Sequence, residues 1–299
     1  MTNIDQKGSA DMKHRVYIHT NRKQILGAMV SKYTIERYSR HLDKFDVEIL
    51  VAEDNLDIQR VLNQTILIEG KETVYAAEDL QSFTLARFLP PSLMAYQGRA
   101  LVIDPDVFST YADVWDLLGS DMGENAILMK EHKQGQWATS VMLLDNARLT
   151  HWRFSALIND LLSNKIDYRD QMTLKNESAS IGNLSASWNS YDELCSETKM
   201  LHNTMRITQP WKTGLPVDFR QKKMRPLWGI VPREWIHYLL GRNPYRYRQH
   251  PDPRQVAFFF TQLKSALQSN AIPTHILENE IALKHVRPDA FKVLRSMTC

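Results

Sequence analysis

The chain has 299 residues, of which 43% are hydrophobic and 24% are charged, and its formal net charge is +3 at pH 7. This composition predicts a globular protein with a sizeable core, and the small net charge does not call for a nucleic-acid partner. With only two cysteines, Cys195 and Cys299, a disulfide framework or a thiolate metal site is not expected.

Residues 1–13 are polar and predict a disordered tail without a secretion signal. No apolar run reaches the length of a membrane span, so we expect a cytoplasmic protein.

The first part of the chain predicts a parallel α/β unit. Residues 15–20 and 45–52 are typical of strands, and between them apolar residues recur at helical spacing over 24–40. A strand, a helix and a strand at this separation favour a parallel pair, and ligands collect at the carboxyl ends of such strands. The loop 18–21 is therefore the first candidate binding loop.

Further strands and helices alternate up to about residue 205, after which strands fade. The predicted elements are short helices over 82–89 and 111–118, strands over 100–103, 126–132 and 138–145, and helices over 146–164, 232–241, 253–269 and 275–295. Pro90 and Pro91 are expected to break or redirect the helix before them, and residues 53–80 carry no clear pattern. We predict an α/β domain over 14–216 and a mostly helical, basic C-terminal extension over 217–299.

The strand over 100–103 ends in Asp104-Pro105-Asp106. Pro105 fixes its own φ and biases Asp104 towards an extended conformation. Two carboxylates at a strand end are hard oxygen ligands of the kind that Mg²⁺ and Mn²⁺ prefer. The alternative is an ordinary turn, because Asp and Pro are common in turns.

Five local signatures follow one another between residues 15 and 214. They are the opening strand and loop over 16–24, Ser82-Phe-Thr-Leu-Ala-Arg-Phe88, the strand and Asp-x-Asp motif over 99–106, the strand over 138–145, and a closing series of Asp170-Gln171, Trp188-Asn189, His202 and Gln209-Pro-Trp-Lys212. In this order they resemble the family 8 glycosyltransferases, the retaining group of glycogenin and the bacterial lipooligosaccharide galactosyltransferases. The resemblance implies a GT-A fold, which is a Rossmann-like α/β domain with a mainly parallel mixed sheet flanked by helices.

The resemblance also implies an activity and a site. The activity is metal-dependent transfer of a hexose, with retention, from a nucleotide-sugar to a glycan or lipid-linked acceptor, and a UDP-sugar is the favoured donor. Asp104, Asp106 and His202 match the metal ligands, a set that suits Mn²⁺ somewhat better than Mg²⁺. Asp170 and Gln171 match the pair that faces the donor sugar and the reacting carbon. The positions expected to bind the donor are Ile18, His19, Thr20, Arg87, Ile103, Asp104, Pro105, Thr139 and Lys212.

Three departures from the family pattern leave parts of this interpretation open. Ala138-Thr-Ser140 stands where the family has Asn-Ala-Gly, and Thr20 or Asn21 stands at its acidic position, so the donor sugar and base are open. Gln209 stands where the family has Lys, which leaves Arg206 or Lys212 as the expected phosphate cation.

Ordinary structural roles are the alternatives for the single residues. His202 would then end a core strand, Arg87 would form a salt bridge, and Asp170-Gln171 would lie at a helix N-terminus, which Asp favours.

The stretch 219–254 has nine Lys or Arg against two acidic residues, together with several aromatic residues. Such a stretch is usually a solvated face; peripheral contact with an anionic membrane is the second interpretation, and single-stranded nucleic acid is the least favoured.

Two other functions stay open from the sequence. One is a catalytically inactive GT-A-like binding or scaffold protein, which the departure at 138–140 supports. The other is a nucleotidyltransferase, which also uses carboxylates and a divalent cation. No glycine-rich phosphate loop is recognisable for it, so it ranks last.

Overall fold

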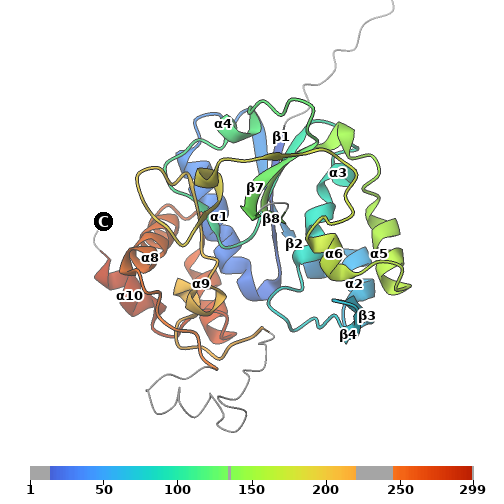
Figure 1. The fold of residues 1–299 in the computed structure, drawn as a ribbon. Helices are drawn as coiled ribbons and strands as arrows, with labels where there is room; N and C mark the ends of the chain where they lie inside the picture. Colours follow the sequence, from blue (N-terminus) through green and yellow to red (C-terminus); the bar gives the residue numbers. More distant parts are fainter. Residues whose placement is uncertain (1–13, 134–135, 220–244, 298–299) are drawn as a thin grey trace, which may run out of the picture.

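A six-stranded mixed sheet forms the centre of the molecule (Figure 1). The computed structural model describes residues 14–133, 136–219 and 245–297. The strand order is β2-β1-β5-β8-β7-β9, and three of the five pairings are parallel (β1 with β2, β1 with β5, β7 with β9). The strands are β1 (His14–Thr20), β2 (Phe45–Val51), β5 (Arg99–Ile103), β7 (Ile127–Lys133), β8 (Gln136–Asp145) and β9 (Ile181–Asn183). The predicted α/β fold with a mainly parallel mixed sheet is confirmed.

Alternating side chains bury both faces of this sheet, because successive strand residues point to opposite sides. Tyr17 and Val102 face one core, against helices α2, α3, α5 and α6. Val16 and Leu101 face the other, against α1 and α4. The helices are α1 (Ile25–Tyr38), α2 (Leu56–Val61), α3 (Pro90–Leu93), α4 (Trp115–Leu118), α5 (Phe154–Leu162) and α6 (Tyr168–Met172).

Two smaller sheets complete the strand content of the described residues. The first joins β6 (Val107–Ser109), β10 (Ser190–Tyr191) and β11 (Met200–His202), and the second is a hairpin of β3 (Thr65–Ile68) and β4 (Lys71–Val74). In the first, β11 runs antiparallel to β6 and His202 is the partner of Val107. Residues far apart in the sequence, at 107 and 202, are thereby fixed side by side.

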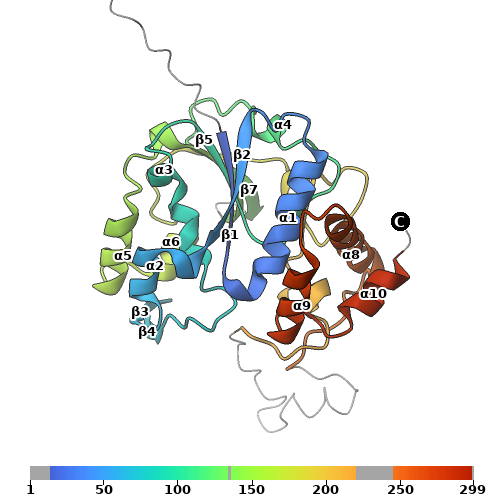
Figure 2. The ribbon, with the colours of Figure 1, turned by 180° about the vertical axis from the view of Figure 1, so that it is seen from behind.

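The C-terminal helices pack against α1, as the view from behind shows (Figure 2). They are α8 (Pro253–Gln268), α9 (Thr274–Ala282) and α10 (Ala290–Ser296). Their apolar side chains form one cluster with Leu26 and Val30 of α1 and with Trp211, whose ring stacks on Phe259 at 4.6 Å between centroids. No helix in the described part of the chain is both long enough and apolar enough to cross a lipid bilayer.

Several predicted element boundaries are wrong. The predicted helix over 146–164 is a 3₁₀ turn, η4 (Asn146–Arg148), followed by the separate helix α5. Trp152 lies between them, where its ring packs on Phe88 and its indole N–H bonds Glu177. The predicted break at the two prolines is confirmed, because the 3₁₀ helix before them ends at Phe88 and the separate helix α3 begins at Pro90, where proline suits a first helical turn.

Other differences are smaller. The helix predicted over 82–89 is a 3₁₀ helix, η3 (Thr84–Phe88), and the one over 111–118 is confined to α4. The pattern over 275–295 divides into α9 and α10, as expected where Pro288 disfavours helical backbone before it. The helix predicted over 232–241 lies outside the described residues.

Candidate functional site

The Asp-Pro-Asp motif lies at the end of β5, in the middle of the sheet. Ile103 is the partner of Ile18 in β1, so His19 follows beside Asp104. The Asp104 amide donates to the Ser140 carbonyl at the antiparallel neighbour β8 (3.0 Å). The chain then turns into β6, which delivers Asp106 to the same edge. Helix α1 approaches this turn closely: a Cβ on Gly27 would lie 2.9 Å from the Pro105 carbonyl oxygen, so a larger residue would displace the turn.

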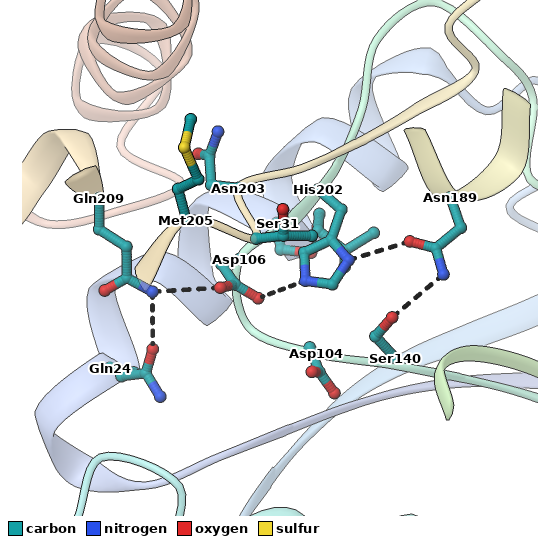
Figure 3. A network of polar contacts seen from close by, with 12 residues as sticks. Gln24, Ser31, Asp104, Asp106, Ser140, Asn189, His202, Asn203, Met205 and Gln209 are labelled. Carbon is teal, nitrogen blue, oxygen red and sulfur yellow. Dashed lines mark hydrogen bonds and ion pairs between the residues drawn. The ribbon is translucent and has the colours of Figure 1, made fainter. Parts of the chain in front are cut away.

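Asp104, Asp106 and His202 form one buried cluster. Their ligand atoms all lie within 4.8 Å of one another. His202 reaches the cluster because β11 pairs with β6, and its Nε2 lies 3.5 Å from Asp106 Oδ1 (Figure 3). Two carboxylates and an imidazole are a donor set that fits a divalent cation such as Mn²⁺ or Mg²⁺. The residues present therefore fit the metal that the sequence predicts.

Asp104 is held by Arg87 of η3 and by His19. Arg87 Nη2 lies 2.6 and 2.7 Å from the two carboxylate oxygens of Asp104, a charge-assisted contact in a buried setting. Burial by itself would raise the pKa of Asp104, but the Arg87 guanidinium, together with His19, outweighs burial and holds this pKa well below its usual range. Asp104 is therefore a carboxylate at neutral pH.

His19 stays neutral next to this carboxylate. Burial lowers the pKa of His19, and the attraction of Asp104 only partly opposes it. His19 Nε2 lies 2.6 Å from Asp104 Oδ1. A carboxylate only accepts, so the proton of the imidazole sits on Nε2. Arg87 Nε, which lies 3.1 Å from the same nitrogen, consequently donates to Asp104 at 3.2 Å instead.

The far sides of Asp106 and His202 are held by amide side chains (Figure 3). Gln209 Nε2 donates to Asp106 Oδ2 at 3.1 Å and lies 3.3 Å from Gln24 Oε1. His202 Nδ1 lies 2.9 Å from Asn189 Oδ1. The sequence named Gln209 and Asn189 only as members of motifs, and no pattern in it indicated these contacts.

The cluster opens into a main cavity of ≈ 1080 Å³. Its lining comes from Gln24 just before α1, from residues 80–87, and from β8, α6, β10 and the 3₁₀ helix η6 (Arg206–Thr208). Besides the cluster, the lining includes Gln24, Phe83, Thr84, Arg87, His132, Trp137, Thr139, Ser140, Tyr168, Arg169, Met172, Lys175, Glu177, Tyr191, Arg206 and Gln209. The aromatic residues Trp137, Tyr168 and Tyr191 were missed, because nothing in a single sequence distinguishes them from core aromatics.

Of the residues predicted to bind the donor, Arg87, Asp104 and Thr139 line this cavity, whereas Ile18, His19, Thr20, Ile103, Pro105 and Lys212 are not among its lining residues. Ile18 and Ile103 are fully buried in the sheet. Thr20 is also buried, and its hydroxyl donates to the Asn21 carbonyl (3.0 Å). The Thr139 hydroxyl accepts from Arg87 Nη1 at 2.9 Å and donates to the Met172 carbonyl at 3.2 Å, so it ties Arg87 to α6.

Lys212 lies elsewhere. Its side chain is almost fully buried, and Nζ donates to Asp218 at 2.7 Å, away from the residues that line the main cavity. Of the two cations that the sequence left open, Arg206 is the one in the cavity lining. Arg206 is exposed, and within the described residues no carboxylate forms an ion pair with it.

Asp170 and Gln171 do not meet the cluster either. Residues 169, 172 and 173 of α6 and its end face the main cavity, whereas Asp170 and Gln171 line a second cavity of ≈ 300 Å³ beside Trp152. Residues 172 and 173 lie three and four positions after residue 169, and residues at these separations share one face of a helix. Asp170 forms an ion pair with Lys175 (2.9 Å).

Comparisons of whole chains give only distant likenesses. No protein-family model and no curated protein matches the sequence. Glycosyltransferases are among the similar solved structures. GlyE of Streptococcus pneumoniae TIGR4 has 17% identity and a TM-score of 0.46, over 78% of this chain and 65% of GlyE. The bifunctional glycosyltransferase WbbM has 12% identity and a TM-score of 0.44, over 71% of this chain and 48% of WbbM. An active-site mutant of LgtC has 12% identity and a TM-score of 0.43, over 66% of this chain and 89% of LgtC.

The chain thus spans less than two thirds of GlyE and about half of WbbM. At these TM-scores the likeness does not decide the function. The geometry of the Asp104, Asp106 and His202 cluster carries the argument that follows.

Proposed function

We propose that this chain is a metal-dependent glycosyltransferase that moves a hexose from a nucleotide-sugar, with a UDP-sugar favoured, to a glycan or lipid-linked acceptor with retention. The observation that carries the proposal is the buried cluster of Asp104, Asp106 and His202 beneath a large cavity at the strand ends. Strand ends at a change of direction in an α/β sheet are where such ligands bind. Support also comes from the order of the sequence motifs, which the cluster unites in space.

The residues around the cluster suit departure of a nucleoside diphosphate. A divalent cation held by Asp104, Asp106 and His202, with Mn²⁺ favoured over Mg²⁺, would offset the negative charge of the leaving diphosphate. Of Arg206 and Lys212, Arg206 is the better suited to add to this effect, because it lines the cavity and no carboxylate among the described residues forms an ion pair with it. Lys212 is less suited, since Asp218 already neutralises it.

The lining of the cavity favours a front-face displacement over a double displacement. In the described lining the carboxylates are Asp104, Asp106 and Glu177. Asp104 forms an ion pair with Arg87, and Asp106 belongs to the metal cluster. Glu177 accepts from the indole of Trp152 and from a backbone N–H. None is free to attack the sugar. In the front-face route the bond from the anomeric carbon to the diphosphate oxygen breaks, the bond to the acceptor oxygen forms on the same face, and the acceptor proton passes to the departing diphosphate oxygen.

A second candidate is a catalytically inactive GT-A-like binding or scaffold protein. The position of Asp170 and Gln171 in a separate cavity favours it, because the resemblance assigned to these two residues the contact with the reacting carbon. Such a protein would bind nucleotide weakly or not at all, without dependence on a metal, and would release no nucleoside diphosphate from a donor. The cytoplasmic location and the membrane contact through 219–254 stay predictions from the sequence, and residues 220–244 lie outside the described part of the chain.

Thermal stability with UDP, GDP and CDP, each with and without Mn²⁺, tests the proposal. A ligand that binds only the folded protein adds about 2.7 kcal/mol at roughly a hundredfold excess over its dissociation constant. We expect a Mn²⁺-dependent shift with one nucleotide, and UDP release from UDP-hexoses in the presence of acceptor glycans. A Mn²⁺-dependent shift without turnover would contradict sugar transfer, and no shift with any nucleotide would contradict the transferase and favour the inactive scaffold protein.

A further inference from the structure

His202 and Asp106 face each other across a gap that no hydrogen bond fills. The 3.5 Å from His202 Nε2 to Asp106 Oδ1 is longer than a normal N–H···O bond. At the other end of the ring, Nδ1 lies 2.9 Å from the amide oxygen of Asn189 (Figure 3). An amide oxygen only accepts, so the imidazole proton of His202 sits on Nδ1. The lone pair of Nε2 is then directed at the Asp106 carboxylate.

Asn189 is fixed in the orientation that this arrangement needs. It is fully buried at the end of η5 (Ala186–Asn189). Its Nδ2 donates to Ser140 Oγ at 3.0 Å, and its backbone carbonyl accepts from Lys130 Nζ at 3.0 Å. Ser140 belongs to β8 and Lys130 to β7, so two strands of the central sheet hold the residue that faces His202.

The Asp106 carboxylate and the unprotonated Nε2 of His202 face each other with no proton between them, an arrangement that favours a cation in that position. An ionised carboxylate and an imidazole lone pair repel at this distance, and a bound cation replaces that repulsion by attraction. Histidine ligands of metals commonly donate their second ring N–H to a fixed acceptor, which sets the tautomer and aims the ligating nitrogen. Asn189 supplies such an acceptor without adding a charge.

We infer that Asn189 is a positioning residue of this site: it holds His202 in the Nδ1–H tautomer and so keeps Nε2 unprotonated and directed at Asp106 for a divalent cation. The inference deepens the proposed function and rests on it for the role of the cation. The tautomer itself depends on neither a metal nor a nucleotide.

The tautomer is measured in the full-length, metal-free protein with ¹⁵N-labelled histidines. Long-range ¹H–¹⁵N spectra at about pH 8.5, above the usual imidazole pKa of about 6.5, report which ring nitrogen carries the proton. Loss of one spin system in His202→Gln assigns the signal. We expect Nδ1–H for His202 in the wild type, a change towards Nε2–H in Asn189→Leu, and return to Nδ1–H in Asn189→Asp, which keeps an acceptor oxygen.

Asn203 provides a matched control. It is as buried as Asn189 and directly follows His202, but its Nδ2 donates to Gln255 Oε1 at 2.7 Å, away from the imidazole. Asn203→Leu should lower stability and leave the His202 tautomer unchanged. Nε2–H in the wild type would overturn the inference, because it requires the Asn189 amide turned round with Ser140 as donor. Nδ1–H retained in Asn189→Leu would overturn it equally.

Mn²⁺ affinity, followed by the electron paramagnetic resonance of free Mn²⁺, gives the second measurement. Loss of a partner that orients a metal ligand typically weakens metal binding about 10- to 100-fold, and we expect this for Asn189→Leu but not for Asn203→Leu. If Asn189→Leu does not fold, the wild-type tautomer and the Asn189→Asp protein still decide the matter. Correct tautomers without Mn²⁺-dependent nucleotide binding would contradict the proposed function and leave the positioning role of Asn189 in place.

Discussion

The main cavity and the second cavity share Glu177 and Leu174 in their walls, yet they hold their carboxylates differently. In the main cavity, Asp106 accepts one amide N–H and faces an imidazole nitrogen that carries no proton. In the second cavity, Asp167 caps α6 and also accepts from the Gly70 amide. Asp170 there is paired with Lys175. Asp106 therefore has lone pairs left for a cation, whereas Asp167 and Asp170 are already used by the fold.

An acidic motif can therefore form a metal site only where the fold leaves carboxylate lone pairs directed at a cavity. Asp104 and Asp106 follow a buried strand, so the sheet fixes where they lie. Asp170 and Gln171 lie on a helix of five residues, and the phase of that helix alone decides which cavity they face.

The largest effect should follow from breaking the buried ion pair behind the cluster. In Arg87→Met, Asp104 keeps its negative charge in a buried position without the guanidinium, which costs about 3–5 kcal/mol of unfolding free energy. Lys175→Met removes the corresponding cation from Asp170 in an exposed pair, where about 0–1 kcal/mol is expected. Urea denaturation of both variants measures the contrast. Equal losses would show that the two cavities do not differ in the way described.

A second pair of variants separates the cavities by function. Asp106→Asn removes a charged ligand of the proposed metal and should weaken Mn²⁺ binding by more than about 100-fold, beyond the effect of losing an orienting partner. Turnover with a UDP-hexose should fall with it, while the circular dichroism spectrum stays near that of the wild type. Asp170→Asn should leave Mn²⁺ affinity within a few-fold of normal, as titration calorimetry can determine. A strong loss of Mn²⁺ binding in Asp170→Asn would place the metal site elsewhere.

The smallest effect concerns the shared wall and depends on pH. Burial alone would raise the pKa of Glu177, but N–H donors from Ala179, Trp152 and His151 outweigh it and lower this pKa. The carboxylate therefore stabilises the fold above its unfolded-state pKa of about 4.3, and the contribution is lost as the pH falls through the lower folded-state value. Glu177→Gln should cost about 1–3 kcal/mol at pH 7. The difference from the wild type should shrink below about pH 4 in denaturant titrations, and a difference independent of pH would contradict this origin.

Much of the fold could be predicted from local pattern. The strands around residues 17, 48, 101 and 142 are apolar runs that fit a buried sheet, and the spacing over 25–38 fits one helix. The helix predicted over 146–164 was wrong because tertiary contacts of Trp152 override local helical preference. The hairpin of β3 and β4 escaped prediction because its strands have only four residues each and β4 is mostly exposed.

The sequence by itself determined that Asp104 and Asp106 end a buried strand, because proline and the apolar run before it restrict the backbone locally. It also indicated His202 through motif order, without any physical link between positions 106 and 202. Only the tertiary structure decided that this histidine meets the carboxylates, through the pairing of β11 with β6. It also decided that Lys212 and Asp170 point elsewhere and that Asn189 and Gln209 hold the cluster. The strand pairing joins positions 107 and 202, and the bond of Gln209 to Asp106 joins residues 103 positions apart, so local backbone preferences carry no information about either contact.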